Sequence, residues 1–265
     1  MTVLATGAAR PSNGAKALIK LAIALGLIAI LVQSWFVVEV NPRDLLSGFP
    51  NIVAIVVRGL PPEASIAKDA VWGALVTLDV AILGTAASTV FSLPLALLAA
   101  DNITPSRTGY AAARGIISVC RTIPDVVWAL IFVTAVGLGP FAAMVGLAIH
   151  STGVLAKLYA EAIEDVDMGP VHALTVMGAN RLQVASQAVI PTVLPSLIGL
   201  TLYRMDTNVR SSLVLGFVGG GGLGLQIEAA LNLFQYRELT MLLIVMGAMI
   251  VGVEALAVYL RRSIH

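Results

Sequence analysis

The chain has 265 residues, of which 58% are hydrophobic and 12% are charged, and its formal net charge is +1. An average soluble domain carries about 25% charged residues, so this composition indicates a protein of the lipid bilayer and argues against nucleic acid as a partner. The single Cys120 cannot form an internal disulfide and is expected to pack within its apolar run.

Six stretches are long and apolar enough to cross a hydrocarbon core of roughly 30 Å as helices. They cover residues 17–38, 71–100, 116–136, 141–160, 192–216 and 239–260. The first stretch follows basic residues like a signal peptide, but it is too long for one and lacks a small-x-small site before Glu39. We therefore expect it to stay in the membrane, in an all-α polytopic fold with six transmembrane helices.

The basic residues are divided unequally between the two sides of the membrane. If the amino terminus is cytoplasmic, only Arg43, Arg58, Lys68 and Arg237 fall outside. The cytoplasmic side then receives Arg10, Lys16, Lys20, Arg107, Arg114, Lys157, Arg181, Arg261 and Arg262. Because lysine and arginine near span ends favour the cytoplasmic side, both termini are expected there.

Residues 167–195, with the sequence DMGPVHALTVMGANRLQVASQAVIPTVLP, interrupt two apolar stretches. Asp167 can cap a short helix whose first turn contains Gly-Pro, and Gly178 would break that helix. A second segment is expected over 179–190, stopping at Pro191. The pattern predicts a helix-turn-helix elbow at the membrane surface, although a connecting loop fits the periodicity equally well.

Ionisable residues within spans are costly and usually face a cavity or one another. Arg121 and Asp125 are four residues apart, so they would share one helical face, with Pro124 between them. This pair fits a gate or pathway element, and it fits an internal ion pair that joins two helices equally well.

The stretch 192–216 alternates charged and polar residues with apolar ones. Arg204 with Asn208, and Asp206 with Arg210, are neighbours at i,i+4 that can pair on a helix. One arginine then remains uncompensated, which suits an anionic solute in a cavity better than a role in packing alone. The candidate pathway residues are Arg121, Asp125, Asp206, Asn208, Arg210 and Ser211.

A run of glycines follows the fifth predicted span. No strand-turn-helix unit surrounds it, so it does not predict a dinucleotide site. The run is expected to let the chain bend or approach another backbone closely, as an external gate or re-entrant turn, while a flexible loop is the alternative. The candidate gate residues are Gly219, Gly220, Gly221 and Gly222. The three histidines form no ligand cluster, and no metal site or catalytic residue is expected.

The elbow resembles the EAA loop of ABC-importer permeases, in which Glu-Ala-Ala precedes a glycine by three residues. Here His172, Ala173 and Leu174 precede Gly178, so histidine takes the usual glutamate position. The stretches CRTIPDVVWALIFV at 120–133, NVRSS at 208–212 and GFVGGGGLG at 216–224 resemble phosphonate-type permeases. Together with the elbow, the resemblance covers roughly residues 71–260.

This resemblance implies an importer-permease (MetI-like) core at 71–262 with a coupling elbow at about 163–191. Before it would lie a disordered cytoplasmic amino terminus at 1–16, and a first transmembrane helix with an external loop at 17–70. The coupling helix would dock on a cytoplasmic ATPase. The residues implied in coupling are Gly169, Pro170, His172, Ala173, Leu174, Met177, Gly178, Ala179 and Arg181.

The implied protein is a multi-pass subunit in the bacterial cytoplasmic membrane that forms the pore of an ATP-driven importer of phosphonate or a related phosphorus oxyanion. Its implied partners are a second copy of itself, two cytoplasmic ATP-binding subunits, an extracytoplasmic solute-binding protein and membrane lipid. The chain contains no G-x-x-x-x-G-K-[ST] motif. It should therefore bind no cofactor and be no enzyme, with ATP and Mg on the ATPase. The alternative is an ion-coupled secondary transporter of an anionic solute, with Asp79, Asp125 and Asp206 as its relay.

Overall fold

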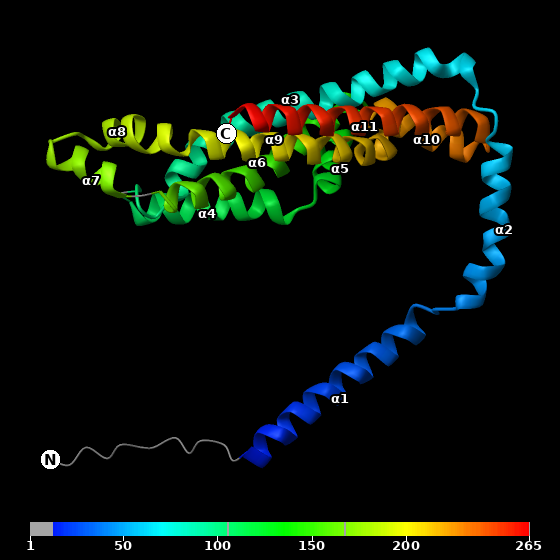
Figure 1. The fold of residues 1–265 in the computed structure, drawn as a ribbon, viewed down its shortest axis with the longest axis horizontal. Helices are drawn as coiled ribbons and strands as arrows, with labels where there is room; N and C mark the ends of the chain where they lie inside the picture. Colours follow the sequence, from blue (N-terminus) through cyan, green and yellow to red (C-terminus); the bar gives the residue numbers. More distant parts are fainter. Residues whose placement is uncertain (1–12, 105, 167, 265) are drawn as a thin grey trace. The chain divides into compact units, whose positions relative to one another are not determined.

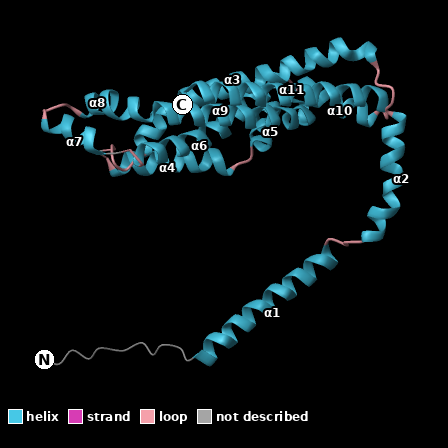
Figure 2. Cartoon of the chain, in the orientation of Figure 1, coloured by secondary structure: helices cyan, strands magenta, loops and turns pink. Residues whose placement is uncertain are grey.

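The computed structural model describes residues 13–104, 106–166 and 168–264. Within these ranges every regular element is a helix (Figures 1 and 2), so the expected all-α fold is confirmed. The chain separates into two compact units, Met1–Ile55 and Val56–His265. The predicted cap Asp167 lies outside the described residues, as does most of the segment predicted to be disordered.

The smaller unit contains α1 (Asn13–Val37) and most of α2 (Pro42–Arg58). Within α1, Lys16–Val37 is long and apolar enough to cross a membrane. The next helix begins because Asn41 Oδ1 accepts a backbone N–H two residues on, at 3.1 Å, and because Pro42 needs no N–H partner in a first turn. The predicted external loop therefore contains a helix of 17 residues.

In the larger unit, α3 (Ala67–Ala99), α6 (Pro140–Glu164) and α9 (Ile190–Leu215) lie side by side (Figure 1). The last helix, α11 (Tyr236–Ile264), packs against α3 and α9. Buried residues of α3, α6 and α9, among them the fully buried Leu155, form one continuous apolar cluster. These three helices also carry the buried polar residues described below.

Small residues let the central helices approach closely. A Cβ atom added to Gly146 of α6 would lie 2.5 Å from the backbone N of Ala129, and one added to Gly153 would lie 2.6 Å from the backbone N of Arg121. These two partners belong to α5 (Asp125–Val136) and α4 (Arg107–Thr122). Close approach through glycine is a common way to pack helices in membranes, so α6 receives its neighbours along a glycine face.

Among the described residues, Ala64–Ala99, Pro140–Glu164 and Tyr236–Leu260 can each cross a membrane unaided, as α1 can. The pair α4 and α5 qualifies only with a bend of 86°, and Ile190–Gly220 with α10 (Gly222–Asn232) only with a bend of 58°. The described residues thus contain four straight candidate spans, or up to six when each bent pair is counted as one span. The higher count equals the six predicted.

The third predicted span, 116–136, is wrong as a single helix. Pro124 disfavours helical geometry in the residue before it, and Ile123 accordingly adopts an extended ψ of 122°. The helix therefore ends at Thr122 and restarts at Asp125.

We predict that Gly146→Ala lowers the thermal midpoint of the purified protein, because the added methyl group meets backbone rather than a movable side chain. Overpacking of this kind typically destabilises by about 1–3 kcal/mol. Gly247→Ala is the matched control, since a Cβ there meets nothing within 4 Å. Equal midpoints for the two variants would contradict the close packing of α5 on α6.

Candidate functional site

A continuous chain of hydrogen bonds crosses the centre of the larger unit. Arg204 Nε on α9 donates to Ser151 Oγ on α6 at 3.1 Å, and Ser151 Oγ donates to Asn208 Oδ1 at 3.0 Å. Asn208 Nδ2 then donates to Thr85 Oγ1 on α3 at 2.9 Å. Ser151 and Asn208 are fully buried. The chain, which we call the central polar network, joins three helices at one level.

Asp206 and Arg210 of α9 form the ion pair predicted from their spacing, with Asp206 Oδ2 at 3.0 Å from Arg210 Nη2. Arg204 makes no ion pair with a carboxylate in the part of the chain that the structure describes. Asp125 contributes only a longer-range attraction to its charge. Arg204 is therefore the uncompensated arginine, and its predicted partner Asn208 is reached through Ser151 rather than directly.

The pair Arg121 and Asp125 does not share a helical face, and that prediction was wrong. The 86° bend places Arg121 in the last turn of α4 and Asp125 at the start of α5. Carbonyl groups freed at the break find partners, since Trp128 Nε1 donates to Cys120 O at 3.2 Å and His150 Nδ1 lies 2.9 Å from Ile123 O. Arg121 is exposed and Asp125 is half-buried.

The predicted elbow is present, and its first helix is α7 (Met168–Val176). It ends in a Schellman motif, in which Ala179 N donates to Leu174 O at 3.1 Å and Gly178 N donates to Thr175 O at 3.0 Å. Gly178 has a φ of +86°, in the left-handed region that only glycine enters at little cost. The predicted helix break at Gly178 is thus confirmed.

A capping box starts the second half of the elbow. Gln183 N donates to Asn180 Oδ1 at 2.9 Å, and Asn180 N donates to Gln183 Oε1 at 2.8 Å. The short helix α8 (Arg181–Val184) continues through a π-helical segment, Ala185–Val189, into α9. The predicted stop at Pro191 was wrong, because the helix continues past this proline after the wider π-helical turn that precedes it.

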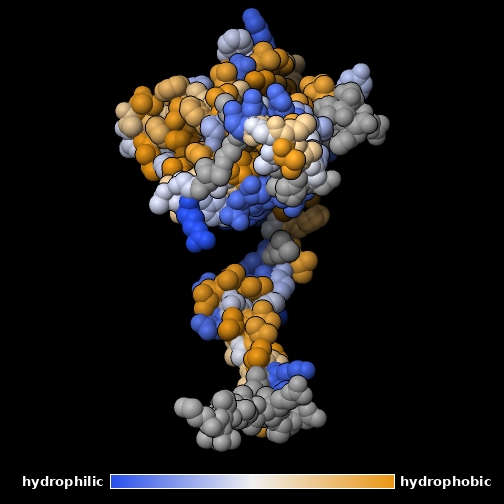
Figure 3. Space-filling view, turned by 90° about the vertical axis from the view of Figure 1, so that its left-hand side faces the viewer, coloured by the Kyte–Doolittle hydropathy of each residue, from blue (hydrophilic) through white to orange (hydrophobic). Residues whose placement is uncertain are grey.

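The turn of the elbow presents apolar side chains to its surroundings. Val176 is 88% exposed and Met177 is 73% exposed. Figure 3 looks onto the end of the larger unit that carries α7 and α8 and shows hydrophilic side chains there beside hydrophobic ones. Gly169, Pro170, Ala173 and Gly178 are exposed, and Leu174 and Ala179 are half-buried. Of the other predicted coupling residues, His172 and Arg181 have side chains outside the described set.

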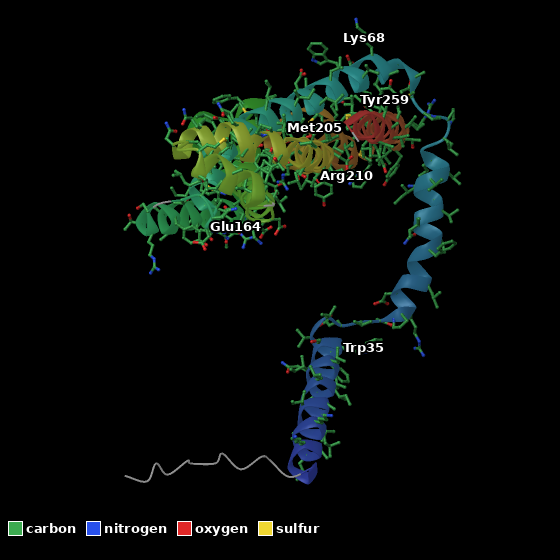
Figure 4. All side chains as sticks on the ribbon, turned by 60° about the vertical axis from the view of Figure 1, so that its left-hand side comes forward. Trp35, Lys68, Glu164, Met205, Arg210 and Tyr259 are labelled. Carbon is green, nitrogen blue, oxygen red and sulfur yellow. The ribbon has the colours of Figure 1, made fainter. Side chains whose placement is uncertain are left out.

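The helix that leads into the elbow is held at its end. Arg114 Nη2 of α4 lies 2.7 Å from Glu164 Oε1, and its Nε donates to Ala99 O at 2.9 Å. The same Glu164 oxygen accepts the backbone N–H of Asp101 at 2.9 Å. These bonds tie Glu164, the last residue of α6 (labelled in Figure 4), to the end of α3 and to the middle of α4. The elbow therefore starts from a fixed point.

The glycine run lies at the second bend. Gly219, Gly221 and Gly222 have φ values of 92°, 75° and 69°. Gly139 N donates to Gly219 O at 2.9 Å, and Leu223 N donates to Thr77 Oγ1 of α3 at 3.0 Å. The bend of 58° and the close approach of backbones confirm the geometry predicted for these glycines.

Residues 92–265 match the family described as the inner membrane component of binding-protein-dependent transport systems. The chain belongs to this family. It is 40% identical over 234 residues to the phosphate-import permease protein PhnE of Mycolicibacterium smegmatis, covering 88% of this chain and 44% of that protein. It is 36% identical over 243 residues to the phosphite transport system permease protein PtxC of Stutzerimonas stutzeri, covering 92% and 88%. The chain thus spans less than half of the M. smegmatis relative.

Among solved structures, a chain of the MetNI methionine ABC transporter in an inward-facing conformation matches with a TM-score of 0.67 and 21% identity. The match covers 77% of this chain and 99% of that chain. At this identity the likeness concerns the fold, and it confirms the expected MetI-like importer-permease fold. The family description also agrees with the predicted location in the inner membrane.

The sequence reasoning missed two members of the central polar network. Ser151 and Thr85 are single hydroxyl residues in apolar helices, and nothing local distinguishes them from the many serines and threonines that bond within their own helix. Thr85 Oγ1 accepts the bond from Asn208 on α9 and also donates to Ala81 O within its own helix at 2.7 Å. The start of α8 did have a local signal, because Asn180 and Gln183 are three residues apart, as in a capping box.

We predict that Asn208→Leu lowers the thermal midpoint, because it leaves the buried Ser151 hydroxyl without its acceptor. The loss of such a buried bond costs about 1–3 kcal/mol. Thr207→Val is the control, since its hydroxyl bonds only Tyr203 O within α9. Equal thermal midpoints for both variants in lipid nanodiscs would argue against a network that holds three helices together.

Proposed function

We propose that this chain is the pore-forming permease subunit of an ATP-driven importer of a phosphonate or a related phosphorus oxyanion. Its family consists of inner membrane components of binding-protein-dependent transport systems. Relatives that match over 88% and 92% of this chain are named for import of phosphate and phosphite. The substrate class follows from these names together with the cationic surplus on α9.

The observation that carries the proposal is the elbow. Its turn exposes Val176 and Met177 while the Schellman motif and the capping box fix its backbone. An exposed apolar tip on a rigid support is typical of a docking surface. We infer that it docks into a groove of a cytoplasmic ATPase subunit. The docking residues would be Gly169, Pro170, His172, Ala173, Leu174, Met177, Gly178, Ala179 and Arg181.

The solute would pass along the polar side of α9 and the start of α5. Two arginines and one aspartate of α9, with Asp206 bound to Arg210, leave Arg204 to attract an anion through the planar guanidinium group. The wider pathway would include Arg121, Asp125, Asp206, Asn208, Arg210 and Ser211. The bend at Gly219–Gly222 would act as the gate at the far end of α9.

The complete transporter would contain a second copy of this chain, two ATP-binding subunits and an extracytoplasmic solute-binding protein. ATP and Mg would be bound by the ATPase subunits, with the amino and carboxyl termini of this chain on the same side as the elbow. An ion-coupled carrier receives less support from the structure, because Asp206 is engaged with Arg210 and Asp79 is exposed on the outside of α3.

The test is transport by the purified complex in proteoliposomes, with phosphite, methylphosphonate and phosphate offered separately. Uptake of at least one of them should require both ATP and the binding protein. Uptake driven by a proton gradient without ATP would refute the ATP-driven mechanism. ATP-dependent uptake of none of the three would refute the substrate class.

Met177→Asp should weaken association with the ATPase subunit at least about tenfold, since an unpaired charge buried in a docking groove costs more than about 1.4 kcal/mol. Co-purification of the tagged ATPase measures this loss. Leu233→Asp is the control, because Leu233 is similarly exposed at 66% in the turn between α10 and α11. Equal retention of the ATPase by both variants would remove the elbow from the interface.

Gly178→Val should uncouple ATP hydrolysis from uptake, because a side chain at a φ of +86° is disfavoured by about 1–2 kcal/mol or more and would reshape the turn. The expected result is continued hydrolysis with little uptake. Gly199→Val serves as control, since its Cβ meets nothing within 4 Å and its φ is helical. Normal uptake per ATP in Gly178→Val would contradict a mechanical role for the turn.

A further inference from the structure

The helix α2 (Pro42–Arg58) has a one-sided distribution of apolar residues. At 100° per residue, Leu46, Phe49, Ile52, Val53, Val56 and Val57 fall on an arc of about 140°. The opposite arc carries Arg43, Asp44, Ser47, Asn51 and Arg58. The apolar residues on this side are Ala54 and Ile55. The sequence thus builds an amphipathic helix where a loop was expected.

No part of the smaller unit that the structure describes covers the apolar arc of α2. Its six residues named above are between 47% and 75% exposed, with Leu46 the most exposed and Val53 the least. Among the side chains of α2 that the structure describes, none is buried. An apolar surface of this length requires an occupant other than water.

Both ends of α2 are tethered to membrane spans. Four residues, 38–41, separate it from α1, so its first residue lies within about 18 Å of the end of that span. Five residues, 59–63, separate its last residue from the span Ala64–Ala99, a reach of about 22 Å. The helix itself is about 25 Å long. Since consecutive spans exit and enter at one membrane face, both ends of α2 are held close to that face.

The second tether is itself fixed within the larger unit. Arg237 Nε donates to Pro61 O at 2.9 Å, Arg237 Nη1 lies 3.5 Å from Glu63 Oε2, and Glu63 N donates to Arg237 O at 3.1 Å. These bonds join residues 61–63 to the start of α11. The segment that follows α2 is therefore attached at the end of a second span.

Each of the two flanking spans carries an exposed tryptophan near the end that is connected to α2. Trp35 lies two residues before the end of α1 and is 53% exposed (Figure 4), and Trp72 lies near the start of α3 and is 67% exposed. Tryptophan is enriched where helices meet the headgroup region. The spans on either side of α2 thus carry the expected anchors of a membrane interface.

We propose that α2 lies along the membrane surface with its apolar arc seated in the lipid interface, as an interfacial helix between the first two spans. Lipid fits this face because the arc is aliphatic and aromatic, contains no charge, and continues the apolar surface of α1 across a short connection. The polar arc, with Arg43 and Arg58, faces headgroups and water. The helix anchors the end of α1 at a defined depth.

The experiment is a spin-label scan of the assembled transporter in nanodiscs, in a Cys120→Ala background that retains uptake. Single nitroxides replace Phe49, Ile52 and Val56 on one arc, and Ser47, Asn51 and Arg58 on the other. Oxygen, which concentrates in lipid, and the aqueous reagent NiEDDA report the surroundings. We expect the ratio of oxygen to NiEDDA accessibility to be several-fold higher on the apolar arc.

Two results would overturn the proposal. High NiEDDA accessibility on both arcs places the helix in water, and an apolar arc that is immobilised and closed to both reagents places it against a protein. Neither result bears on ATP-driven uptake, so the proposed function is tested separately.

Two double variants, each carrying a single nitroxide at position 49, provide a further test. Ile52→Asp combined with Val56→Asp should lift the helix and lower the oxygen to NiEDDA ratio several-fold. Asn51→Asp combined with Ala54→Asp adds the same charge to the polar arc and should leave the ratio unchanged. An unchanged ratio in the first variant would show that lipid contact through this arc does not hold α2.

Discussion

The arrangement of the larger unit depends on the central polar network, the chain of bonds from Arg204 through Ser151 and Asn208 to Thr85. Lipid cannot hydrogen-bond to such groups, so each must find its partner in the protein. Apolar contacts between helices in a membrane are weakly selective, because lipid tails are equally apolar. Directional bonds between α9, α6 and α3 therefore fix the register of these helices, and the glycines of α6 allow the required approach.

The network also joins the two helices that enter and leave the elbow. α6 contributes Ser151 and ends at Glu164, where Arg114 ties it to α3 and α4. α9 begins directly after the π-helical segment Ala185–Val189 and contributes Arg204 and Asn208. Neither α6 nor α9 can slide along the other without breaking a buried hydrogen bond. The two helices that flank the elbow are therefore joined as a pair.

Composition and local sequence predicted much of this fold. Long apolar stretches predicted the straight spans, because hydrophobic length alone decides them. The elbow was predictable because a glycine such as Gly178 can adopt the positive φ that ends a helix. Two further features had signals in the sequence. The amphipathic period of residues 42–58 predicts α2, and Pro124 after Ile123 predicts the helix break. The break was overlooked because residues 116–136 were expected to form one straight span. The network was not predictable, because the partners of Ser151 and Thr85 are 57 and 123 residues away in the chain.

The two arginines of α9 differ in how their charges are compensated within the described residues. Arg210 is 51% exposed and forms an ion pair with Asp206, so a residue in the same helix largely neutralises its charge. Arg204 is buried and bonded to a neutral serine, so its charge is held in place without being neutralised at close range. A buried guanidinium group of this kind attracts an oxyanion strongly because the surrounding dielectric is low. In the proposed function, this uncompensated charge is the feature of α9 that would draw an anion into the membrane.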